Sequence, residues 1–214
     1  MAIVRYEVHA PLIDFDWTGT TFSLAPGILI DKIKPQLKGL DKGAGEDERR
    51  DIRSASHWLH FDSTSDASPG PAETVTLLLL SLWMVKPTRT HVRCRFELNK
   101  DHNGSQNGSQ YLGTFKRMLG RFSWIPGYVR PGHTTADLTR AARYFQQLGQ
   151  VVRADGRLYQ ALVLNSAGCM AYQWHVGFIC HSAAAEALLT YKKGYGLTER
   201  LSTTFACVTH RGKT

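Results

Sequence analysis

The chain has 214 residues, with 26 lysines and arginines, 18 aspartates and glutamates and a formal net charge of +8. Its 43% hydrophobic and 21% charged residues are ordinary for a globular protein and exclude a mostly disordered or collagen-like chain. Four cysteines without a C-x-x-C pair exclude a disulfide-built scaffold and indicate reduced thiols. The positive charge favours a polyanionic partner such as RNA or DNA, because lysine and arginine displace counterions from phosphates. A protein that is merely basic is the alternative.

The N-terminal part of the chain predicts strands. Residues 2–15 alternate in polarity, and Thr20–Ile33 contains a second strand interrupted at Pro26-Gly27. Residues 38–50 are polar and predict a loop that runs into a helix near Asp47. From Glu48 to Phe61 the pattern fits either helix or strand, and residues 62–71 have the composition of a surface loop.

Residues 74–85, TVTLLLLSLWMV, form the most apolar stretch of the chain. Twelve residues are too few to span a bilayer, so we expect a buried core element that stops at Lys86-Pro87. Residues 90–98 alternate clearly and predict a strand with Val92, Cys94 and Phe96 on its apolar face. The first fifteen residues lack the apolar run of a signal peptide, and we therefore expect a cytoplasmic protein.

Beyond Tyr111 the pattern becomes helical. Thr134 and Asp137 have the spacing of a capping box in which the threonine hydroxyl accepts the Asp137 backbone N–H. Apolar positions then recur at helical spacing over residues 138–148, 158–172 and 175–190, and a last helix is expected from residue 197. We therefore predict an α+β protein, with a mixed, strand-bearing region at 1–110 and an all-helical bundle at 111–214.

One segment combines aromatic and basic side chains. Residues 111–130, YLGTFKRMLGRFSWIPGYVR, interleave them in the way that proteins grip single-stranded nucleic acid. A packed connector between the two halves is the alternative. The candidate nucleic-acid-binding residues are Lys116, Arg117, Arg121, Trp124 and Arg130.

Glu186 lies in the apolar run 183–189, where a carboxylate is costly unless it is paired or held in a polar site. A solvated edge or a structural ion pair is the simpler explanation. No G-x-S-x-G elbow or H-E-x-x-H pair is present, and Gly212-Lys213-Thr214 lacks the earlier glycine of a phosphate-binding loop. We expect no metal and no cofactor. Zinc held by Cys180, His181, Cys207 and His210 is the least favoured possibility.

The C-terminal half resembles the Apea-like HEPN proteins of bacteria. The resemblance lies in the segments 137–141 (DLTRA), 157–162 (RLYQAL), 183–189 (AAAEALL, with Glu186 at the family's glutamate) and 197–201 (LTERL). In the other half, residues 27–30, 58–59 and 82–88 are similar to the strand-rich region that often precedes this domain. The resemblance implies a helical, usually dimeric domain and a metal-independent ribonuclease of toxin or phage-defence systems.

This sequence departs from the family at the catalytic motif, Arg-x(4–6)-His, in which histidine acts as general acid or base and arginine stabilises the phosphate. Arg200 and His210 are separated by nine residues, and the helix that carries the motif would fall beyond Thr214. Arg50 and His57, like Arg53 and His60, have the permitted spacing but lie in the other half. We assign no catalytic residue. The expected function is an RNA-associated defence or toxin module, with a regulatory or small-molecule-binding protein that dimerises through its helical half as the alternative.

Overall fold

The computed structural model describes residues 4–37, 39, 44–86, 88, 90–99, 110–113, 132–154, 156–170 and 174–189. The chain divides into two compact units, Met1–Gln150 and Val151–Thr214. We describe each unit separately. The boundary between residues 110 and 111, drawn from composition, stays a prediction.

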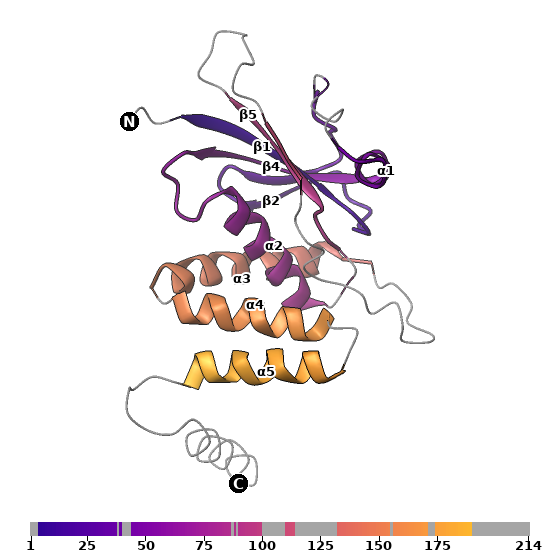
Figure 1. Ribbon diagram of the computed structural model, residues 1–214. Helices are drawn as coiled ribbons and strands as arrows, with labels where there is room; N and C mark the ends of the chain where they lie inside the picture. Colours follow the sequence, from indigo (N-terminus) through magenta and orange to yellow (C-terminus); the bar gives the residue numbers. More distant parts are fainter. Residues whose placement is uncertain are drawn as a thin grey trace. The chain divides into compact units, whose positions relative to one another are not determined.

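The first unit is built on a six-stranded sheet in the order β2-β3-β4-β1-β5-β6, with every pair antiparallel (Figure 1). The predicted mixture of helices and strands is thus confirmed. The strands are β1 (Arg5–Leu12), β2 (Thr21–Ala25), β3 (Ile28–Asp31), β4 (His57–Thr64), β5 (Cys94–Asn99) and β6 (Gln110–Gly113). The interruption predicted at Pro26-Gly27 is a turn that joins two antiparallel strands, β2 and β3, and Gly27 takes the positive φ of 76° there. β6 is a correction, since residues 111–113 were expected to be helical and instead pair with β5.

The two faces of the sheet are covered by different elements. On one face, Trp58, Cys94 and Phe96 pack with Ile52 of α1 (Glu46–Ser54). The opposite face carries buried apolar side chains of β1, β3 and β4. These are Val8, Ala10, Leu12, Ile30 and Leu59. β4 supplies residues to both sets, Trp58 to one face and Leu59 to the other, because successive side chains point to opposite faces.

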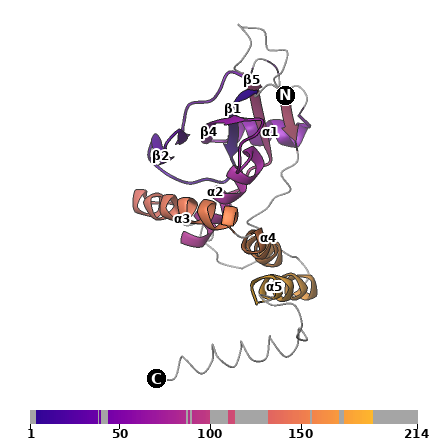
Figure 2. The ribbon, with the colours of Figure 1, turned by 90° about the vertical axis from the view of Figure 1, so that its left-hand side faces the viewer.

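The Leu-rich stretch is helix α2 (Pro71–Val85), buried over residues 74–82. Gly70 precedes it, Pro71 occupies its first position, and Glu73 accepts the Gly70 N–H at 3.3 Å, so its start is capped. In both ribbon views α2 runs from the sheet and crosses α3 (Thr135–Ala154) (Figures 1 and 2). A helix that is buried on several sides can be apolar all round, and this is the case for α2.

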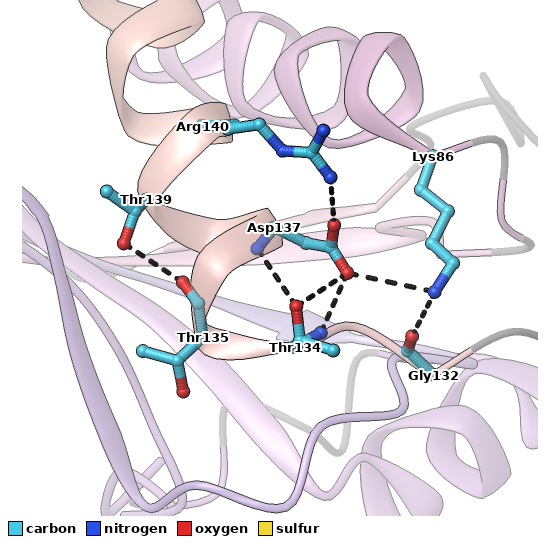
Figure 3. A network of polar contacts seen from close by, with 7 residues as sticks. All are labelled: Lys86, Gly132, Thr134, Thr135, Asp137, Thr139 and Arg140. Atoms are coloured by element: carbon cyan, nitrogen blue, oxygen red, sulfur yellow. Dashed lines mark hydrogen bonds and ion pairs between the residues drawn. The ribbon is translucent and has the colours of Figure 1, made fainter.

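The predicted capping box at the start of α3 is confirmed. The Asp137 N–H donates to the Thr134 hydroxyl at 3.1 Å, and the Thr134 N–H donates to the Asp137 carboxylate at 2.9 Å (Figure 3). Arg140 and Lys86 also contact this carboxylate, at 2.5 and 3.7 Å, and the Lys86 ammonium donates to the Gly132 carbonyl at 2.6 Å. The network joins the end of α2 to the start of α3.

The second unit contains a helical hairpin of α4 (Gly156–Met170) and α5 (Trp174–Leu189), as the periodicity predicts. His181 of α5 is hydrogen-bonded to the Asn165 side chain of α4 at 3.0 Å. A Cβ atom added at Gly168 would lie 2.8 Å from the His181 ring, so glycine permits this close approach. The helix expected from residue 197 lies outside the described residues.

Candidate nucleic-acid interface

Helix α1 borders an open hollow of about 650 Å³. The residues that line it are Glu46, Arg49, Arg50, Arg53 and Ser54. All three arginines are exposed, and their positions three and four residues apart place them on one side of the helix. Three guanidinium groups that share one hollow can donate several hydrogen bonds to phosphate oxygens.

Helix α1 also carries four carboxylates, but three of them are engaged by other groups. The arginines therefore dominate the lining of the hollow. Glu48 accepts the Gly45 N–H at 2.9 Å and so caps the helix. Asp51 binds Arg93 at 2.7 Å, and this hydrogen bond raises the pKa of the Arg93 guanidinium further above its ordinary value. Asp47 is shared between Arg50 at 2.8 Å and Arg93 at 4.0 Å. Only Glu46 adds a carboxylate to the lining of the hollow.

The two arginine–histidine pairs with the spacing of the ribonuclease motif do not form catalytic pairs. His57 is 1% exposed, and its ring contacts the Gly19 carbonyl at 3.0 Å and the Ser56 hydroxyl at 2.9 Å. Burial lowers the pKa of the His57 imidazole. His60 contacts Asp31 and His9 instead of an arginine. Arg50 and Arg53 face the hollow on α1.

The other predicted site residues give a mixed outcome. Lys116, Arg117, Arg121, Trp124 and Arg130 lie outside the described residues, and their role stays a prediction. Glu186 lies on α5 and is half-buried. Helical spacing places it on the same side of α5 as Ile179 and Ser182. Its assignment to a site or to a structural pair also stays a prediction.

Polar side chains form a row across three neighbouring strands. Glu7 and His9 come from β1, His60 from β4 and Asp31 from β3. The two imidazoles approach at 2.6 Å between their Nδ1 atoms. His60 Nε2 lies 3.0 Å from Asp31, and His9 Nε2 lies 3.5 Å from Glu7. We call these four residues the histidine row.

The described residues hold no group of three or more His, Cys, Asp or Glu side chains placed to bind a metal ion. Cys94 is buried, and its burial, with Glu48 and Asp51 nearby, raises the pKa of its thiol to about 12. A thiol with such a pKa is a poor nucleophile at neutral pH. His133 is buried against Phe15, with ring centroids 5.2 Å apart, and burial lowers the pKa of its imidazole.

Comparisons with protein-family models, with curated proteins and with solved structures found no match. Of the helices that the structure describes, none combines the length and the apolar character that crossing a membrane requires.

The hollow beside α1 was not singled out from the sequence. The sequence feature that could have indicated it lies in Glu46–Ser54, where three arginines fall within five positions of a helix. The adjacent acidic residues made this feature hard to recognise, because their partners, Arg93 just before β5 and the Gly45 N–H at the helix start, became known only from the fold.

Proposed function

We propose that this protein binds RNA through Arg49, Arg50 and Arg53 of α1. The observation that carries the proposal is the open hollow that these three exposed arginines line. The net charge of +8 supports the same conclusion, since a positive protein gathers polyanions at its surface. The catalytic machinery of a ribonuclease forms no part of the proposal. Its link to defence or toxin systems rests on the resemblance of the C-terminal half to HEPN proteins.

The test measures the affinity of the full chain for a fluorescently labelled single-stranded RNA at several salt concentrations. The variant Arg49→Gln/Arg50→Gln/Arg53→Gln removes the three guanidinium groups without adding negative charge. Each lost phosphate contact reduces the salt slope by about 0.7, so three lost contacts weaken binding about 100-fold at 0.1 M salt. We expect this loss, together with a flatter salt dependence.

The matched control is Arg5→Gln/Lys34→Gln/Arg143→Gln, which removes three exposed cations outside α1. We expect a much smaller loss of affinity. Equal losses in both triple variants would show that net charge alone attracts RNA, and salt-insensitive retention by the wild type would refute phosphate binding. A third variant, Lys116→Gln/Arg117→Gln/Arg121→Gln, tests the segment predicted from sequence.

A second candidate function, a regulatory protein that dimerises through its helical half, is favoured by one observation on α5. Val176, Phe178 and Ile179 are 41%, 65% and 63% exposed, although large apolar side chains normally avoid water. We expect Phe178→Asp/Ile179→Asp to convert a wild-type dimer into a monomer in sedimentation velocity. Met84→Asp, at an exposed apolar residue of α2, is the control and leaves the dimer intact. A monomeric wild type at tens of micromolar would eliminate this candidate.

A further inference from the structure

The carboxylate of Asp47 contacts two arginines, each through a different oxygen. Its Oδ1 accepts a hydrogen bond from Arg50 Nη2 at 2.8 Å, and its Oδ2 lies 4.0 Å from Arg93 Nη2. Arg50 is one of the three arginines that line the hollow of α1, whereas Arg93 directly precedes β5. Asp47 thus links an arginine of the hollow to an arginine at the start of a strand of the sheet.

The two arginines differ in how firmly they are held. The Arg50 and Asp47 side chains are 72% and 62% exposed, and an ion pair at such exposure contributes little to stability. The Arg93 side chain is 24% exposed, and its Nη1 donates to the Asp51 carboxylate at 2.7 Å. Arg93 therefore stays beside Asp47, while Arg50 can leave Asp47 for another anion.

A phosphate that binds Arg50 competes with Asp47 for the same guanidinium group. Phosphates and carboxylates both accept hydrogen bonds from this planar group. Once Arg50 turns to a phosphate, the Asp47 carboxylate loses its partner and repels the bound polyanion. Arg93 Nη2, which already lies 4.0 Å away, can bind this carboxylate after a small side-chain movement, because Nη1 alone holds Asp51.

We propose that Asp47 exchanges its ion pair with Arg50 for one with Arg93 when Arg50 binds a phosphate of RNA. Asp47 restrains Arg50 in the free protein. Arg93 is a positioning residue, which withdraws the competing carboxylate without contacting RNA itself. The inference rests on the proposed binding of RNA by α1 and adds a restraint on that site.

Glu46 provides a matched control for Asp47. Both are exposed acidic residues in the first turn of α1, and Glu46 also lines the hollow. Within the part of the chain that the structure describes, Arg50 is the one arginine of α1 that forms an ion pair, and its partner is Asp47. Replacing either acidic residue removes one negative charge beside the arginines, but only the replacement of Asp47 releases an arginine.

The affinity of the full chain for the labelled single-stranded RNA tests the release of Arg50. We expect Asp47→Asn to bind about two- to fivefold more tightly than the wild type, which is the range that corresponds to an exposed ion pair. Glu46→Gln is expected to gain less, because it removes charge without releasing an arginine. Equal gains in the two variants would overturn the proposed exchange.

Arg93→Lys tests the role of Arg93 at an unchanged net charge. Lysine is a point charge that can hold Asp51 but lacks the fork that reaches Asp47 as well. We expect this variant to bind RNA about twofold more weakly than the wild type. In the Asp47→Asn background the same substitution should leave the affinity unchanged, because no carboxylate then needs a second partner. Equal losses in both backgrounds would show that Arg93 acts independently of Asp47, and would refute the proposal.

The outcomes separate this inference from the proposed function. If Arg49→Gln/Arg50→Gln/Arg53→Gln loses no more affinity than its control, RNA does not bind at α1, and both proposals fail. If that variant binds as weakly as expected but Asp47→Asn leaves the affinity unchanged, α1 binds RNA without the exchange, and only the present inference fails.

Discussion

Replacing Asp137 by alanine is expected to destabilise the first unit by about 2–3 kcal/mol, through loss of the helix cap and of a buried hydrogen-bonded charge. Asp137 is 6% exposed, and its carboxylate accepts from the Thr134 N–H and hydroxyl, both at 2.9 Å. It also neutralises Lys86 at the end of α2. Urea denaturation, followed by far-ultraviolet circular dichroism, measures the loss.

Asp137 also makes the free energy of unfolding of the first unit depend on pH. The hydrogen bond from the Thr134 backbone, followed by those from Arg140 and the Thr134 hydroxyl, holds the pKa of Asp137 well below its ordinary value. As the pH falls, the unfolded chain binds the proton first, near its ordinary pKa of about 3.9. The ionised Asp137 carboxylate therefore stabilises the folded state fully above about pH 5. This stabilisation is lost as the pH falls towards the pKa of Asp137 in the folded state.

The measurement compares wild type and Asp137→Asn from pH 8 to pH 3. We expect a constant difference in unfolding free energy down to about pH 5 and a shrinking difference below it. Asp47→Asn is the control, because Asp47 pairs with Arg50 at an exposed position where both side chains are more than half exposed. A difference that does not change with pH would show that Asp137 acts without its charge.

Replacing Gly19 by alanine is expected to destabilise the first unit by about 1–3 kcal/mol through overpacking. A Cβ atom at this position would lie 2.0 Å from the indole ring of Trp17. The indole cannot easily move, because it is 7% exposed and lies against Phe22 and His57, with ring centroids 6.1 and 5.5 Å away. Thermal denaturation measures the effect, and about 2–4 °C of melting temperature corresponds to each kcal/mol in a chain of this size.

Gly149→Ala is the matched control, with the opposite expected sign. Gly149 lies inside α3, and a Cβ atom added there meets nothing within 4 Å. Alanine restricts the unfolded chain and favours the helix by about 0.5–1 kcal/mol. If Gly19→Ala were neutral, the packing of Trp17 against Gly19 would have to be looser than the structure shows.

Features that depend on a few neighbouring residues were predictable from the sequence. The capping box of Thr134 and Asp137 was placed correctly, because its two hydrogen bonds span only three residues. The turn at Gly27 and the strands β1 and β5 were also found, since glycine permits a positive φ and alternation of residue types in a sequence indicates a strand. The helices α3, α4 and α5 followed from apolar spacing alone.

Features that depend on distant residues were decided by the tertiary structure. Residues 110–113 form β6 only because β5 offers an edge for pairing, and four residues are too few to show alternation. His9 and His60 became partners because β1 pairs with β4 across 51 positions of sequence. The hollow of α1 is lined mainly by arginines because Arg93, which directly precedes β5, engages the helix carboxylates Asp47 and Asp51.

The sequence by itself thus determined the local elements and the positive charge of the chain, because caps, turns and periodicity are properties of short segments. Strand order and side-chain partners were fixed by the tertiary structure, because burial and hydrogen bonding bring together residues that no spacing rule connects. Both the α1 arginines and the histidine row depend on this second kind of information.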